Sequence, residues 1–216
     1  METPRILKAL GSELSRLAKE HQLAVIPGGG KFADIVRELD SRFQLPATVS
    51  HWMAILGMDQ YGLLLSQVIA CSEVCDSLRA AKEISQNGRA AILQPTKMLR
   101  RFDPFEPSWD VTSDSIAAYI AYKLNAATVV FVTDVDGIFT ANPKEQSKSK
   151  LFSQVSIEEL LKFSSRTSVD KFLPVFLSAH MLDCYVVNGR FPERVTRVLS
   201  GQETIATHIQ PIMCLS

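Results

Sequence analysis

The sequence has neither an excess of one charge nor an apolar run long enough to span a membrane. Its 23 Lys and Arg residues balance 23 Asp and Glu residues, for a formal net charge of +0. A neutral chain exerts no overall attraction on nucleic acid or an anionic membrane, so we expect neither as a partner. The start, Met1–Pro4, lacks the apolar stretch of a signal peptide, and we expect a cytoplasmic protein.

Cysteine is scarce. The chain has Cys71, Cys75, Cys184 and Cys214, a small number that fits a reducing compartment. Cys71 and Cys75 could be metal ligands, but no second pair of Cys or His follows at zinc-binding spacing. We therefore expect structural thiols and no metal held by the protein alone.

Two common nucleotide-binding patterns are also absent. Gly28, Gly29 and Gly30 are not followed by Gly-Lys-Ser/Thr at Walker spacing, and they do not form a dinucleotide fingerprint. Consecutive glycines nevertheless let the backbone approach a ligand closely. The helix expected next directs free amides and its positive end at the turn, which favours phosphate. We favour binding over a ligand-free turn, because three glycines exceed what a turn requires.

Apolar spacing predicts an alternation of helices and strands. Helices are expected at 4–20, 31–43, 48–70, 78–86, 114–124, 156–163, 169–181 and 192–199. Strands are expected at 22–26, 90–93, 128–132, 184–187 and 205–209, and loops at 100–107 and 142–150. This order predicts an α/β fold, a three-layer αβα sandwich with a mostly parallel central sheet, in a single domain. We expect 53–65 to be largely buried and 128–132 to be covered on both faces.

The segment Ser108–Asp114 concentrates two carboxylates and two hydroxyls just before an expected helix. Such groups can order a lysine, a magnesium-bound water or a substrate hydroxyl. On spacing alone, helix capping by Thr112 or Ser113 is the better interpretation.

Two further segments lie at strand ends. Thr133–Gly137 follows the most β-branched strand, at the edge where ligands bind in open α/β sheets, and a simple Asp-Gly turn is an equal alternative. Val187–Arg190 follows another strand. There, Arg190 and Arg194 are either anion contacts or solvated side chains.

Taken in order, these four segments resemble the amino-acid kinase superfamily, which includes acetylglutamate kinase, bacterial uridylate kinase and isopentenyl phosphate kinase. The motifs are Gly-Gly-Gly after a strand, Thr-Ser-Asp opening a helix, Thr-Asp-Val-Asp-Gly-Ile-Phe after a strand, and Asn-Gly-Arg near the C-terminus. Each motif alone is weak, whereas the ordered set is specific.

A narrower resemblance is to the kinases of methanofuran biosynthesis, which phosphorylate an aminomethylfuran-methyl phosphate to its diphosphate. It rests on Ile26–Ala33, on Ser108-Trp109 with Thr112–Ser115, and on Val186–Val195, and extends over the chain from about Leu7. The resemblance implies ATP-dependent transfer onto a phosphate monoester. A kinase for isopentenyl phosphate or a nucleoside monophosphate, and a non-catalytic nucleotide-binding homologue, are the alternatives.

The resemblance also implies site residues. The acceptor and the transferred phosphoryl group would be held by Gly28, Gly29, Gly30, Asp59 and Thr112. The acceptor-binding part would cover about 1–107, and Thr112 would lie just beyond it. Asp114 would be the organising, catalytic carboxylate. Nucleotide contacts in the part 108–216 would come from Thr133, Asp134, Gly137, Phe139, Asn188 and Gly189. The implied cofactors are ATP and Mg²⁺, which bridges phosphates. The apolar helix at 53–65 could supply the face of a homodimer or higher homo-oligomer.

One segment of the family pattern is not found. Family members begin with a strand bearing a Lys and a Gly-Gly-Ser turn that contact the transferring phosphates, whereas this sequence begins at Met1, directly before its first helix. The expected sheet would then lack a strand near its centre. A gene start placed too late, a shortened chain and a member without activity all stay open.

Overall fold

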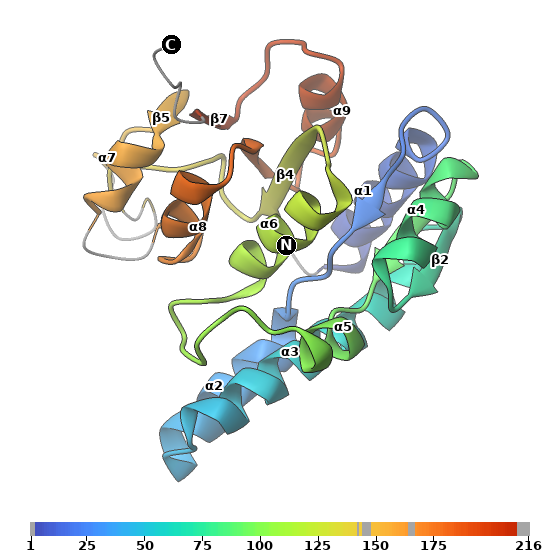
Figure 1. Ribbon diagram of the computed structural model, residues 1–216. Coiled ribbons are helices and arrows are strands. Elements are labelled where there is room, and N and C mark those ends of the chain that lie inside the picture. The colour runs from blue at the N-terminus through green and yellow to red at the C-terminus, as the bar shows by residue number, and fades with distance from the viewer. Residues whose placement is uncertain (1–2, 142, 144–147, 164–166, 211–216) are drawn as a thin grey trace. The chain divides into compact units, whose positions relative to one another are not determined.

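The structure is a computed structural model that describes residues 3–141, 143, 148–163 and 167–210. The chain divides into two compact units, 2–116 and 117–216 (Figure 1). Each is described by itself, and the expectation of a single domain stays a prediction.

The first unit contains a three-stranded parallel sheet and its helices. Its elements are α1 (Pro4–Leu17), β1 (Ala24–Val25), α2 (Gly30–Phe43), α3 (Ala47–Val68), β2 (Ser72–Cys75), α4 (Leu78–Gln86), β3 (Ala90–Leu93) and α5 (Thr96–Arg101). The strand order is β1-β3-β2. The central strand β3 is buried along its whole length, which explains its continuous apolar sequence.

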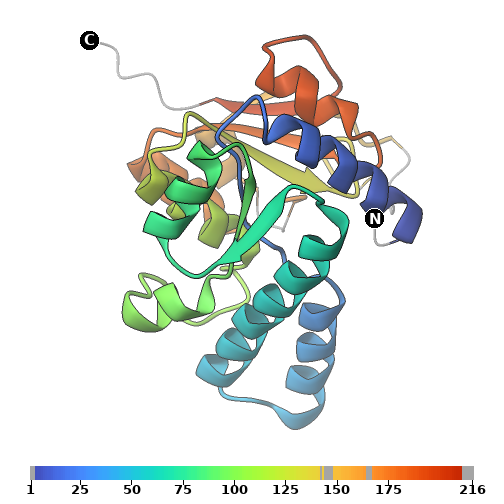
Figure 2. The same ribbon diagram turned by 90° about the vertical axis from the view of Figure 1, so that its right-hand side faces the viewer.

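Helices α2 and α3 form a hairpin and lie side by side (Figures 1 and 2). The connection begins at Gln44, whose φ of 51° ends α2 in the left-handed region. Glycines permit close helix contacts in this unit. A Cβ on Gly57 of α3 would lie 3.1 Å from the Cβ of Phe32, and one on Gly11 of α1 would lie 2.2 Å from the carbonyl oxygen of Val68. Both glycines therefore let α3 pack tightly against its neighbours.

The expectation that 53–65 is largely buried is wrong for one side of α3. Its inner side chains are buried, namely Ile55, Met58 and Leu65. Three others are exposed, Leu56 at 41%, Leu63 at 55% and Leu64 at 44%. Neighbouring elements cover only one face of a helix, and apolar composition does not reveal which residues lie on the other.

The second unit contains a four-stranded mixed sheet. Helix α6 (Ser113–Leu124) leads into it, followed by β4 (Thr128–Thr133), β5 (Gln154–Ser156), α7 (Ile157–Leu161), α8 (Leu173–Ala179), β6 (Asp183–Asn188), α9 (Glu193–Leu199) and β7 (Thr207–Gln210). The order is β4-β6-β7-β5, with β6 and β7 antiparallel and the other pairs parallel.

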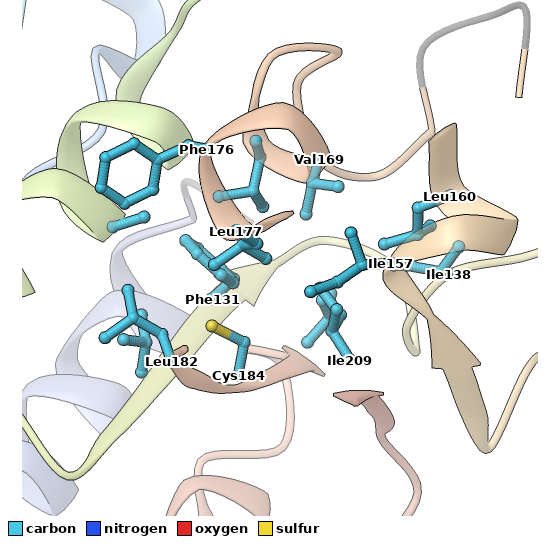
Figure 3. Close-up of a cluster of buried hydrophobic side chains, with 14 of the residues drawn as sticks. Phe131, Ile138, Ile157, Leu160, Val169, Phe176, Leu177, Leu182, Cys184 and Ile209 are labelled. Carbon is cyan, nitrogen blue, oxygen red and sulfur yellow. The ribbon is translucent and has the colours of Figure 1, made fainter. Parts of the chain in front are cut away.

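One hydrophobic cluster forms the core of this unit (Figure 3). The sheet contributes Phe131, Cys184 and Ile209, and the helices add Leu160 and Leu177. Helix α7 begins with a capping box in which the Ser156 and Glu159 side chains each bind the other's backbone N–H.

The predicted α/β class with mostly parallel strands is confirmed, but the described strands form two sheets instead of one. Among the described strands, β1 is an end strand of the first sheet and β4 is an end strand of the second. Along β4, Val129 and Phe131 face the core cluster and are buried, and the other residues are partly exposed, so the strand is not covered on both faces as expected.

Other element predictions differ in detail. Strands β2 and β5 and helix α5 were not predicted, and α8 spans Leu173–Ala179 within the expected 169–181. The residues 170–172 precede it, and the Asp170 side chain accepts a hydrogen bond from the N–H of Leu173, its first residue. Part of the expected loop 142–150, and Cys214, lie outside the described residues.

The described cysteines Cys71, Cys75 and Cys184 are free thiols. Burial raises the pKa of Cys75 to about 11 and that of Cys184 to about 12, so both stay protonated at neutral pH. Within the described ranges, no helix is long and apolar enough to cross a membrane.

Candidate functional site

The turn 27–30 joins β1 to α2, and two of its glycines have a local structural reason. Gly30 has a φ of 49°, in the region that other residues rarely adopt. A Cβ on Gly29 would lie 2.4 Å from the Cβ of Ala33 in the next turn of α2. A tight strand-to-helix turn is therefore enough to explain Gly29 and Gly30.

Gly28 is different. A Cβ there would meet only the Ser113 Oγ, at 3.6 Å, which is an ordinary contact. The fold of this unit would thus accept a side chain at position 28. The same distance places the start of α6 beside the glycine turn, so the N-termini of α2 and α6 both lie there.

The turn lies at the carboxyl edge of the first sheet. Ala24 and Val25 of β1 pair with Ala91 and Ile92 of β3, so the residues that follow both strands emerge at one edge. Gly62 of α3 lies beneath this edge, since a Cβ there would lie 3.1 Å from Pro27 Cγ. Helix α3 is thereby held directly against the glycine turn.

Asp59 of α3 reaches the same edge. Its Oδ1 accepts a hydrogen bond from the Thr96 N–H at 3.3 Å, and its backbone carbonyl accepts one from Gln94 Nε2 at 3.0 Å. Burial raises the pKa of Asp59, and the hydrogen bonds with Thr96 offset part of that increase. The carboxylate is therefore partly desolvated beside the first residues of α5.

Thr112 and Asp114 lie on either side of Ser113, and Asp114 is in the first turn of α6. The Thr112 carbonyl accepts a hydrogen bond from the Ile116 N–H at 3.2 Å, which places Thr112 at the start of the helix. In the first unit, the structure thus brings together the glycine turn, Asp59 and the start of α6. Their roles in binding and catalysis stay predictions.

Sequence reasoning predicted a loop at 100–107 but missed the contacts that fix the segment leading to α6. Its two ends are fixed to the α2–α3 hairpin: His51 Nε2 lies 2.8 Å from Asp103 Oδ2, and Trp109 Nε1 donates to Asp40 Oδ2 at 2.6 Å. These pairs are separated by 52 and 69 residues, so no local pattern reveals them. They fix the segment that precedes α6 against the hairpin.

In the second unit, the predicted nucleotide segments meet at the carboxyl ends of β4 and β6. Thr133 is in register with Asn188, and the Gly189 N–H donates to the Thr133 carbonyl at 2.9 Å. The Thr133 hydroxyl donates to the Val135 carbonyl at 3.0 Å, within the turn that also contains Asp134. The two segments therefore form one continuous edge.

Asp136 holds the two segments together. Its Oδ1 accepts hydrogen bonds from Asn188 Nδ2 at 3.0 Å and from Arg194 Nη1 at 2.5 Å. Arg194 is buried and lies 4.2 Å from the Phe191 ring centre, so it is not a solvated side chain, and the anion it contacts is Asp136. Burial favours a higher pKa for Asp136, but the hydrogen bonds from Arg194 and Asn188 outweigh burial and lower it.

Gly137 completes this turn. Its φ is 154°, and a Cβ there would lie 2.3 Å from Thr207 Oγ1. That hydroxyl also accepts a hydrogen bond from the Ile138 N–H at 2.8 Å. Phe139 follows and forms an isolated antiparallel bridge with Leu151. Gly137 is therefore needed for packing whether or not a nucleotide binds.

Comparison with known proteins agrees with this arrangement. The model of the amino acid kinase family matches residues 1–188. The chain is 37% identical to the [5-(aminomethyl)furan-3-yl]methyl phosphate kinase of Methanocaldococcus jannaschii, over 94% of this chain and 91% of that protein. It is 24% identical to a uridylate kinase of Thermococcus kodakarensis, over 95% and 91% of the two chains. The fold matches a uridylate kinase structure from Archaeoglobus fulgidus with a TM-score of 0.76, 20% identity and coverage of 96% and 94%. The chain belongs to the amino acid kinase family.

The link between Asp136 and Arg194 predicts a pH-dependent stability. Because the folded pKa of Asp136 is depressed, its ionised form stabilises the fold at pH values above the unfolded pKa. This contribution is lost as the pH falls through the folded value. Asp136→Asn should therefore be less stable than the wild type by about 1 kcal/mol at pH 7, a deficit that shrinks below about pH 4.

Urea unfolding at a series of pH values measures this difference. Glu203→Gln, at an exposed position, serves as the control and should match the wild type throughout. A deficit for Asp136→Asn that stays the same from pH 7 to pH 3 would show that the charge of Asp136 does not stabilise the turn.

Proposed function

We propose that this chain transfers the γ-phosphoryl group of ATP onto the phosphate of [5-(aminomethyl)furan-3-yl]methyl phosphate, giving the diphosphate. Membership of the amino acid kinase family supports an ATP-dependent phosphotransferase. Kinase relatives with phosphorylated acceptors support a phosphate monoester as the acceptor. The particular acceptor is favoured by 37% identity over nearly the whole of both chains.

The observation that carries the proposal is the unfilled position at Gly28, beside the N-termini of α2 and α6. Phosphoryl transfer depends mainly on positioning and charge neutralisation. Helix N-termini provide free N–H groups and a positive potential that favour phosphate. We assign the acceptor phosphate to this turn, with Gly28, Gly29, Gly30 and Thr112 around it, and Asp114 as the organising carboxylate.

The nucleotide is assigned to the carboxyl edge of β4 and β6. The side chains of Asn188 and Thr133 form hydrogen bonds within the turn, so we assign them the role of shaping the loop. Asp134, Gly137, Phe139 and Gly189 complete the proposed nucleotide contacts. Carboxylate oxygens are suitable ligands for Mg²⁺, and Asp114 fits that chemistry; when bound, Mg²⁺ would bridge phosphates and neutralise their charge.

Asp114→Asn should lower turnover about 100-fold or more, because the amide removes a charge and leaves the shape of the side chain. It should cost no more than about 1 kcal/mol of stability, the typical value of an acidic residue in the first turn of a helix. Asp76→Asn is the matched control, since Asp76 is paired with the exposed Lys97 on the surface. A coupled ATP-consumption assay measures turnover, and phosphorus NMR identifies the product as a diphosphate.

The acceptors to compare are the aminomethylfuran phosphate, isopentenyl phosphate and UMP. We expect turnover with the first. A strong preference for UMP or isopentenyl phosphate would replace the proposed acceptor, and binding of ATP with no turnover on any of the three would favour a non-catalytic homologue. Full activity of Asp114→Asn would remove the role assigned to Asp114.

The glycine turn gives a second prediction. Gly28→Ala should keep the stability of the wild type within about 1 kcal/mol, because the new Cβ makes only an ordinary contact. Its turnover should fall about tenfold or more, because the methyl group enters the space assigned to the acceptor phosphate. Gly29→Ala is the comparison and should instead lose about 1–3 kcal/mol of stability through contact with Ala33.

Unfolding in urea and steady-state kinetics on both variants separate the two effects. Normal acceptor KM and kcat in Gly28→Ala would mean that the acceptor phosphate does not approach this residue.

A further inference from the structure

Asp59 has an unusual electrostatic position in the first unit. Its Oδ1 accepts a hydrogen bond from the Thr96 N–H at 3.3 Å, and Thr96, an uncharged residue, is the partner that favours its ionised form. Asp59 forms no ion pair with any Lys or Arg that the structure describes. A partly desolvated carboxylate without a counter-charge is unfavourable for folding, so its presence calls for another explanation.

The groups around Asp59 are uncharged. The Thr96 side chain is buried, and its hydroxyl and its N–H both help to lower the pKa of Asp59. Thr96 and Gln94, which both bind Asp59, follow β3, and β3 lies next to the strand that leads into the glycine turn. This group of polar atoms therefore borders the turn assigned to the acceptor phosphate.

Nearby carboxylates already have partners. Asp40 accepts a hydrogen bond from Trp109, and Asp103 is bound to His51. On α2, Asp34 lies within 4 Å of both Lys31 and Arg37. These three carboxylates are paired with side chains of the fold, whereas Asp59 has no cationic partner among the described residues.

We infer that Asp59 binds the ammonium group of the acceptor and thereby selects phosphates that bear a primary amine over neutral ones. The inference rests on the proposed function, because it assumes that the acceptor phosphate lies at the glycine turn. A primary aliphatic amine is protonated at neutral pH, as in lysine. Its N–H groups would bind the Asp59 carboxylate and supply the missing counter-charge.

This pairing would determine specificity more than rate. Isopentenyl phosphate has no amine, so it would leave Asp59 desolvated and unpaired, which disfavours its binding. UMP offers uncharged hydroxyl and amide donors, which pair less strongly with a carboxylate than an ammonium does. Asp59 would therefore lower the KM for the aminomethyl acceptor and have little effect on kcat.

The test is a two-by-two comparison of acceptors and variants. The acceptors are the aminomethylfuran phosphate and an analogue with a methyl group in place of the aminomethyl group. The variants are the wild type and Asp59→Asn, whose amide oxygen can still accept from the Thr96 N–H. Asp76→Asn is the control for the removal of one negative charge.

We expect Asp59→Asn to raise the KM for the aminomethyl acceptor about 30-fold and to change that for the methyl analogue by less than about threefold. Acidification should also raise the wild-type KM for the aminomethyl acceptor, because a protonated Asp59 cannot pair with an ammonium. Because the acceptor phosphate also titrates near neutral pH, the rise is compared with that for the methyl analogue, and the difference between the two acceptors should be absent in Asp59→Asn. Urea unfolding should show that the variant is at least as stable as the wild type, since a desolvated charge is removed.

Equal losses on both acceptors, or none on either, would overturn the role of Asp59 while leaving the proposed function intact. A larger loss with UMP than with the aminomethyl acceptor would also overturn it and indicate that Asp59 binds hydroxyl groups. No turnover of the aminomethyl acceptor by the wild type would instead overturn the proposed function, and this inference with it.

Discussion

The close contact of α3 with the β1–α2 turn is the constraint on which the first unit depends. Gly57 and Gly62 have no side chains, so Phe32 and Pro27 can approach α3 within van der Waals distance. That contact sets the direction of the N-terminus of α2. It also brings Asp59, which lies between these two glycines in α3, to the sheet edge beside Thr96. Larger residues at either glycine would move the turn and the carboxylate apart.

In the second unit, polar side chains hold the loop that follows β4. Asp136, Asn188 and Arg194 form a polar contact between the ends of β4 and β6, while Thr207 occupies the space beside Gly137. These side chains are committed to holding the loop, so they are not free to change with the ligand. A preformed edge of this kind reduces the entropy lost when a ligand is ordered there. The segment proposed to bind the nucleotide is thus partly a structural motif.

Sequence patterns predicted the elements whose signals are local. Helix α4 has Ser77 as its cap and the Asn87-Gly88 stop, and β3 is a fully apolar run, so both were found with correct bounds. Strand β2 was missed because Ser72–Cys75 has one buried residue and no apolar alternation. The partners of Asp59, Asp136 and Asp103 lie 37, 58 and 52 positions away along the chain. Only the folded chain reveals these contacts. Motif order therefore predicted the candidate site segments, while their long-range contacts required the structure.

The central claim is that the glycine turn and the start of α6 together hold the acceptor phosphate. Amide hydrogen exchange of the protein, with and without the aminomethylfuran phosphate and in the absence of ATP, tests it most directly. The account predicts slower exchange at residues 28–32 and 113–115 when the acceptor is present. Unchanged exchange in both segments, with protection confined to other parts of the chain, would contradict it.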